Sequence, residues 1–198
     1  MINVVPKPYQ RPHPPLFQAF SLSEETVRWC AREGIRPTII LPKPEVVREL
    51  GQAYVEEAQK AGRALKLGQN IGVLRGIYLA DNVEHARKLA ETGMCVLGFK
   101  ELFHHFGFTE AWREPADEAK YPTGKVPLPA SEVTAERIER VKFAYMGSVD
   151  DVKRGLDELV EKANPEWFVW QGDQGFLPKD EVKRQIEVFG KKLLPRYS

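Results

Sequence analysis

One unit recurs four times along this sequence: a short apolar run, a short turn and an amphipathic stretch with helical spacing. The four copies cover residues 16–33, 37–61, 71–92 and 166–194. A strand followed by a helix, repeated in this way, favours a parallel sheet with right-handed crossover connections. The pattern alone leaves two architectures open, a doubly wound sheet and part of a barrel. We expect one α/β domain over residues 1–198.

Residues 93–147 interrupt this rhythm. Met94–Phe106 has helical character, whereas residues 107–135 are rich in proline, glycine, alanine and charge. We predict a long surface excursion with at most one short helix there, followed by a helix over Thr134–Tyr145. Long loops inside a compact domain are commonly lids or mobile segments, so residues 107–140 are a candidate lid.

Composition excludes several classes of function. The net charge is +1, and 42% of the residues are hydrophobic and 29% charged. This balance gives no electrostatic reason to expect nucleic acid or an anionic membrane as a partner. Two isolated cysteines make neither a disulfide framework nor a zinc site, so we expect no metal and a reduced, cytoplasmic protein. No apolar run approaches ~18 residues, and the N-terminus lacks a signal-peptide pattern.

One charged residue interrupts the apolar run Ile71–Ala80. Arg75 lies in its middle, in a strand that is expected to be buried on both faces. A buried arginine needs a carboxylate, phosphate or carbonyl partner. We favour a position at a strand end, or a structural carboxylate partner, over a role in ligand binding.

The first unit carries the candidate binding residues. Leu16–Phe20 predicts a buried strand, and Ser23 is a good N-cap for a helix whose first turn contains Glu24 and Glu25. Two interpretations remain open at this point. The turn is an ordinary helix cap, or Ser23, Thr26 and the free backbone N–H groups between them hold a phosphate.

The run PHPPLFQAFSLSEETVRWCAREG, residues 12–34, resembles the luciferase-like flavin monooxygenase family. In that family a Pro-His-Pro-Pro segment precedes an apolar strand, a Ser-x-Glu-Thr turn and a helix that closes on glycine. The family's usual proline after the serine is Glu24 here. Residues 107–140 are the least family-like part. The resemblance continues in the helix around residues 54–62 and in the stretches IYLADNVEHARKLA, MGSVDDVKRGLDELVEKANPEWFVW and KRQIEVFGKKLLP.

The resemblance implies a fold and a cofactor site. Luciferase-like proteins are (β/α)8 barrels, and their turn serine and threonine bind the phosphate of FMN. Carried over, Ser23 and Thr26 are the side-chain donors, and Leu22 and Ser23 offer backbone N–H groups. Related barrels use the deazaflavin coenzyme F420 at the same turn. The resemblance identifies no catalytic residue in this chain.

Length limits what the resemblance can imply. A full barrel takes about 250 residues or more, and the four βα units here match the later half of the family's pattern. We therefore expect a partial (β/α)8 barrel, which is either a fragment or is completed by another chain. Two copies would supply eight strands.

Three functions follow from the resemblance. The first is an FMN-dependent monooxygenase that uses reduced flavin and O2 to oxygenate a small organic substrate. The second is a non-catalytic half-barrel subunit that completes a partner chain, and the third is an F420-dependent oxidoreductase.

Overall fold

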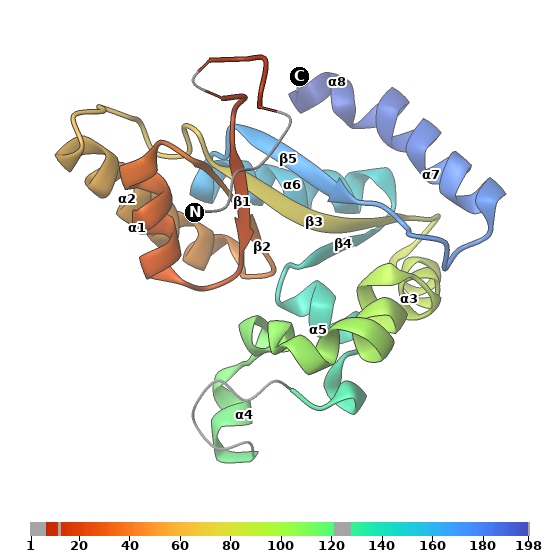
Figure 1. The fold of residues 1–198 in the computed structure, drawn as a ribbon. Coiled ribbons are helices and arrows are strands. Elements are labelled where there is room, and N and C mark those ends of the chain that lie inside the picture. Colours follow the sequence, from red (N-terminus) through yellow and green to blue (C-terminus); the bar gives the residue numbers. More distant parts are fainter. Residues whose placement is uncertain (1–6, 12, 121–127, 198) are drawn as a thin grey trace.

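A computed structural model describes residues 7–11, 13–120 and 128–197, and Figure 1 shows the arrangement of their elements. All four strand–turn–helix units predicted from the sequence are present. Among the described residues, no helix is both long and apolar enough to cross a bilayer. The helices and strands are β1 (Phe17–Phe20), α1 (Glu24–Glu33), β2 (Arg36–Ile40), α2 (Pro44–Lys60), β3 (Gly72–Leu79), α3 (Val83–Thr92), a π-helix (Met94–Phe103), α4 (Pro115–Lys120), α5 (Ala135–Arg140), β4 (Ala144–Gly147), α6 (Val149–Ala163), β5 (Trp167–Gln171), α7 (Lys179–Lys192) and α8 (Leu194–Tyr197).

Every strand pairing in the sheet is parallel, as predicted. β1 pairs with β2, β2 with β3, and β3 with β5, so the strands of the four recurring units are neighbours in chain order. The register places Phe17 opposite Arg36, Thr38 opposite Gly72, and Gly72 opposite Trp167. β4 is an addition to this set and pairs with the carboxyl-terminal half of β3.

β4 corrects one prediction. The sequence predicted a helix over Thr134–Tyr145, but α5 ends at Arg140 and Ala144 begins a strand. Lys142 has a φ of 60°, a left-handed conformation that an α-helix cannot continue through. The apolar residues that follow, Ala144–Gly147, then pair with β3 and are fully buried.

The outer face of the sheet carries the main core. Val73 and Ile77 of β3, Ile39 of β2 and Tyr145 of β4 share this face and form one apolar cluster with α1, α2 and α6. Arg75 also lies within the sheet and is completely buried. Its guanidinium donates to the carbonyl oxygens of Leu74 at 2.7 Å and Pro42 at 2.5 Å.

Arg75 therefore departs from the position that we favoured, because it stands in the middle of β3 and donates to backbone carbonyl oxygens rather than to a structural carboxylate. The carbonyl of Pro42 is available because Leu41, with a φ of 78°, turns the chain sharply after β2.

The inner face of the sheet is the side that carries Phe17, Arg36, Gly72 and Trp167. The register places Phe17 opposite Arg36, and Gly72 between Thr38 and Trp167. The Arg36 guanidinium lies 5.7 Å from the centre of the Phe17 ring and 5.8 Å from the Trp167 ring. The two rings meet edge to face at 5.3 Å, so side chains of the edge strands β1 and β5 contact each other across the inner face.

The prediction that β1 is a buried strand is wrong. Phe17 is 54% exposed, and of the four residues only Phe20, on the outer face, is buried. The sheet ends at β1 in the described part of the chain, and no helix there covers the inner face at this strand.

The segment after α3 covers the other end of the inner face. The π-helix places the Cys95 sulfur only 2.4 Å from where a Cβ atom on Gly76 would stand, so a side chain at position 76 does not fit. Phe99 of the same helix stacks on Trp112 and Phe143, with ring centres 4.8 and 5.4 Å apart. Trp112 is completely buried. The region predicted as a surface excursion is thus anchored to a second apolar core. Among the described residues between 107 and 134, α4 is the one α-helix, in agreement with the prediction of at most one short helix.

A buried ion pair stabilises this second core. The guanidinium of Arg137 on α5 makes two hydrogen bonds with the Asp117 carboxylate of α4, at 2.7 and 3.1 Å, and both side chains are less than a tenth exposed. These hydrogen bonds hold the pKa of Asp117 below its usual value.

We expect Arg137→Ala to lower the free energy of unfolding by about 3 kcal/mol or more, since it leaves the Asp117 carboxylate buried without its partner. Arg140→Ala is the matched control, because its ion pair with Glu114 is largely exposed and should contribute less than about 1 kcal/mol. Urea unfolding measures both. Equal effects of the two variants would contradict this account.

The same pair predicts an acid limit on stability. The folded pKa of Asp117 is depressed, so its contribution is complete above the ordinary carboxyl pKa of about 4 and is lost as pH falls from there through the folded value. The wild-type protein should lose stability over this interval more steeply than Arg137→Ala. Parallel pH profiles for the two proteins would refute the prediction.

Candidate functional site

The turn between β1 and α1 brings two of the predicted binding residues together. Ser23 is the N-cap of α1, and its Oγ accepts hydrogen bonds from the backbone N–H of Thr26 at 3.1 Å and from the Thr26 hydroxyl at 2.8 Å. A hydroxyl accepts two hydrogen bonds and donates one. The Ser23 hydroxyl therefore has both acceptor positions filled by Thr26 and keeps its hydrogen for another acceptor.

The backbone of the turn also offers donors. Among the described residues, the N–H groups of Leu22, Ser23, Glu24 and Glu25 have no hydrogen-bond acceptor. The Ser21 hydroxyl is buried and likewise lacks a partner within the described chain. Leu22, Ser23, Glu24 and Glu25 are exposed, so the donors of the turn are open to a ligand.

At the start of α6, by contrast, the hydroxyl and the N–H of the capping serine both find an acceptor within the turn. Ser148 caps that helix, but its hydroxyl donates to the Asp151 carboxylate at 2.6 Å, and the Ser148 N–H donates to the same carboxylate at 2.9 Å. α1 has Thr26 at the position of Asp151. The Thr26 hydroxyl donates to Ser23, whereas the Asp151 carboxylate accepts from Ser148, so the Ser23 hydroxyl keeps a hydrogen that the Ser148 hydroxyl has already used.

Charged side chains of both α1 and α2 lie near the turn. Glu24 forms an ion pair with Arg28 at 2.7 Å, and Arg28 also lies 3.7 Å from Glu56 and 3.6 Å from Glu57. The hydrogen bond from Arg28 to Glu24 raises the pKa of the guanidinium, which stays charged. The turn thus supplies hydroxyl and amide donors for an anion, while this cation is already committed to carboxylates.

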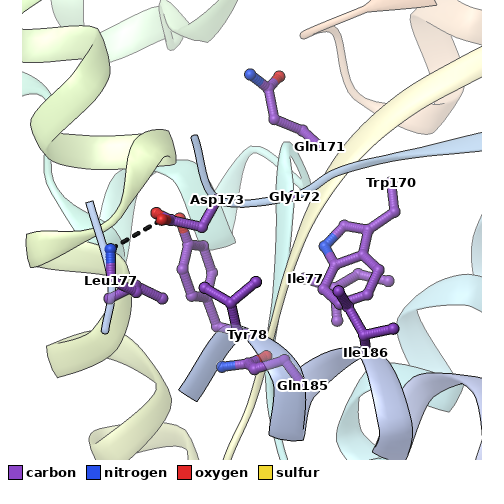
Figure 2. A pocket seen from close by; sticks show the side chains of 10 residues that line it. Ile77, Tyr78, Trp170, Gln171, Gly172, Asp173, Leu177, Gln185 and Ile186 are labelled. Carbon is purple, nitrogen blue, oxygen red and sulfur yellow. Dashed lines mark hydrogen bonds between the residues drawn. The ribbon is translucent and has the colours of Figure 1, made fainter. Parts of the chain in front are cut away.

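A second feature lies at the carboxyl end of β5, and the sequence did not predict it. A cavity of about 260 Å³ opens there between β3, β5 and α7. Figure 2 shows Asp173, Leu177 and Tyr78 on one side of it and Trp170 and Ile186 on the other. The Gly-Asp-Gln-Gly loop that follows β5 was the available signal, since loops at the carboxyl ends of parallel strands hold ligands in such folds.

The loop is fixed by one oxygen of Asp173. Its Oδ2 accepts from the backbone N–H groups of Gly175 at 2.9 Å and Leu177 at 2.8 Å. Across the cavity wall, the Tyr78 hydroxyl accepts from the N–H of Cys95 at 3.0 Å. Burial raises the pKa of Tyr78 strongly and that of the Cys95 thiol to about 12, and the negative charge of Asp173 adds to both shifts. Both groups are neutral near pH 7, so neither is an activated nucleophile.

No family model matches the chain. An uncharacterised protein of Sinorhizobium fredii is 27% identical over 183 residues, which cover 90% of this chain and 48% of that protein. This relative adds no function, but it shows that the sequence pattern occurs within a longer protein.

Solved structures settle the fold. Monooxygenase RslO1 from Streptomyces bottropensis has a TM-score of 0.67 at 20% identity, over 98% of this chain and 51% of that one. The oxygenating constituent of 3,6-diketocamphane monooxygenase from Pseudomonas putida, solved with FMN, has a TM-score of 0.70 at 16% identity, over 94% and 50%. Coenzyme F420-dependent tetrahydromethanopterin reductase from Methanopyrus kandleri has a TM-score of 0.62 at 15% identity, over 93% and 51%.

The chain therefore has the luciferase-like fold, and the predicted partial (β/α)8 barrel is confirmed. It spans about half the length of the proteins that it matches. These structural neighbours are monooxygenases and oxidoreductases that act with FMN in one case and F420 in another. At these identities the likeness establishes the fold, and the turn geometry must carry any argument about function.

Proposed function

We propose that this chain is the later half of a flavin-binding luciferase-like barrel and that the turn formed by Leu22, Ser23 and Thr26 binds the phosphate of FMN. The observation that carries the proposal is the contrast between the two capped helices. In the α6 turn the hydroxyl and the N–H of Ser148 both donate to Asp151, whereas the hydroxyl hydrogen and the N–H of Ser23 in the α1 turn have no acceptor among the described residues. A phosphate at a helix N-terminus supplies the acceptors that such donors need.

Each residue of the turn has a separate task in this proposal. The Ser23 hydroxyl donates its free hydrogen to a phosphate oxygen, and the N–H groups of Leu22 and Ser23 donate to the same group. Thr26 orients Ser23 through the 2.8 Å hydrogen bond between their hydroxyls. The bound flavin, once reduced, would supply the electrons with which O2 is used to oxygenate a small organic substrate. The cations that balance the phosphate charge would come from the other half of the barrel.

Two other functions remain as candidates. F420 also carries a phosphate, so the turn fits either cofactor, and one structural neighbour is an F420-dependent reductase. A non-catalytic half-barrel subunit is favoured by a different observation, the match to only about half of each relative. In that case the turn would bind a phosphate, or nothing, and the chain would act by completing a partner.

We expect Ser23→Ala to weaken FMN binding by roughly ten- to a hundredfold, the loss of one hydrogen bond to a charged group. Riboflavin lacks the phosphate, so its affinity should not change. Fluorescence quenching of the two flavins measures both values.

The control for this variant is Ser148→Ala, which removes the cap of α6 and should cost about 1 kcal/mol of stability without affecting FMN. Equal losses for FMN and riboflavin in Ser23→Ala would exclude a role in phosphate binding.

We also propose that the barrel is completed by a homo-oligomer or by another chain. Phe17 is exposed on the inner face of an edge strand, where a completing strand would pack. Phe17→Glu should therefore shift the assembly towards monomer in light scattering, and Trp29→Glu, on α1, should leave the mass unchanged. If the wild-type chain stays monomeric and retains no yellow FMN after free flavin is removed, both the proposed assembly and the proposed enzymatic function would be contradicted.

A further inference from the structure

The cavity at the end of β5 contains two polar atoms that the proposed phosphate turn does not involve. Asp173 Oδ1 and Trp170 Nε1 are both buried and have no hydrogen-bond partner within the described chain. Leaving one such group unpaired costs about 1–3 kcal/mol, so native structures usually give it a partner. An unpaired carboxylate oxygen is the more costly of the two, because it belongs to a charged group.

Gln185, another polar side chain that lines the cavity, is already engaged. It is buried, its Oε1 accepts from the Leu79 N–H at 2.8 Å, and its Nε2 donates to Glu181 at 2.9 Å. Within the described chain, Asp173 Oδ1 and Trp170 Nε1 are the buried side-chain atoms of the cavity lining that have no partner. The cavity therefore lacks a donor for Asp173 and an acceptor for Trp170.

Charge narrows the class of ligand. Asp173 is the only residue with a formal charge among those that line the cavity in the described structure, and neither lysine, arginine nor histidine is among them. An anion would meet an unscreened carboxylate, whereas a cation with N–H groups compensates its charge and its free oxygen together.

The size of the cavity and the chemistry of its wall narrow the class of ligand further. The volume of about 260 Å³ is that of about nine water molecules. The indole of Trp170 and the aliphatic side chains of Ile77 and Ile186 form much of the wall (Figure 2). Val182 of α7 adds to it. Aromatic faces attract organic cations, and aliphatic walls take up an apolar body.

Ile186 marks the mouth of the cavity. Its side chain is 55% exposed. It lines the cavity and also meets solvent, so it stands where a ligand would enter.

We propose that this cavity binds a small organic ammonium compound. Its ammonium group donates to Asp173 Oδ1, and its apolar body lies between Trp170 and the aliphatic residues of α7. The proposal does not depend on flavin binding, because no residue of the α1 turn takes part in it.

Benzylamine, which is protonated at neutral pH, is the probe, with benzyl alcohol and benzoate as neutral and anionic analogues of similar shape. Calorimetric titration of the flavin-free chain should give benzylamine an affinity at least about tenfold above benzyl alcohol, and benzoate should not bind. If benzylamine does not bind at concentrations up to about 10 mM, its binding free energy is weaker than about −3 kcal/mol. The cavity would then hold water only, and the proposal would be overturned.

Asp173→Asn tests the carboxylate. Its amide oxygen can still accept from Gly175 and Leu177, so the loop should stay folded while the negative charge is lost. Benzylamine should then bind about tenfold or more weakly and benzyl alcohol as before. Asp180→Asn, at the exposed start of α7, is the matched control and should change neither affinity.

A second variant keeps the test decisive if Asp173→Asn fails to fold. Ile186→Ala removes part of the apolar wall at an exposed position and should weaken benzylamine and benzyl alcohol by the same factor. Unchanged benzylamine affinity in a folded Asp173→Asn protein, or in Ile186→Ala, would contradict the assigned binding mode.

Discussion

A parallel sheet is found almost only where both of its faces are covered, and the rest of this structure follows from how that requirement is met. The outer face is covered by α1, α2 and α6 in the usual manner of βα units. The inner face is covered unequally. The π-helix and the segment anchored by Asp117 and Arg137 close it over the carboxyl-terminal half of β3, while β1 leaves Phe17 exposed. The open part is where the first half of a barrel would pack.

Two glycines of β3 make the inner face possible. A Cβ atom on Gly72 would stand 1.7 Å from the Trp167 indole nitrogen, and one on Gly76 would stand 2.4 Å from the Cys95 sulfur. The absence of side chains lets β5 close its tryptophan over β3 at one end and lets the π-helix approach at the other. Both contacts are long-range, and together they position the loop after β5 that carries Asp173.

The local features of this fold could be predicted from the sequence. Ser23, Ser148 and the left-handed Gly34 act within one turn of their helices, so their residue types alone mark the helix ends. Arg75 could not be predicted in this way, because its acceptor at Pro42 becomes available only through the turn after β2. The exposure of Phe17 follows from the position of β1 at the edge of the described sheet, and the apolar run alone did not predict that position.

The two candidate sites differ in the same way: one is formed by residues close in sequence, the other by residues that only the fold brings together. Ser23 and Thr26 are three residues apart on one helix, so sequence spacing brought them together correctly, and the hydrogen bond between them follows from helical geometry. The cavity at β5 gathers residues from two strands and a helix, with Gln185 joined to Leu79 across 106 positions. The cavity depends on tertiary packing, and the Gly-Asp-Gln-Gly loop after β5 was the one part of it that the sequence indicated.

In the proposed function, the donors of the α1 turn hold the phosphate of a flavin. An amide NMR titration of the isotope-labelled chain with FMN, and separately with riboflavin, tests this role. FMN should shift the backbone amide signals of Leu22, Ser23 and Glu24 far more than riboflavin does, while the amides at the start of α6 should stay in place. Signals at the α1 turn that do not move with FMN, or that move equally with riboflavin, would contradict it.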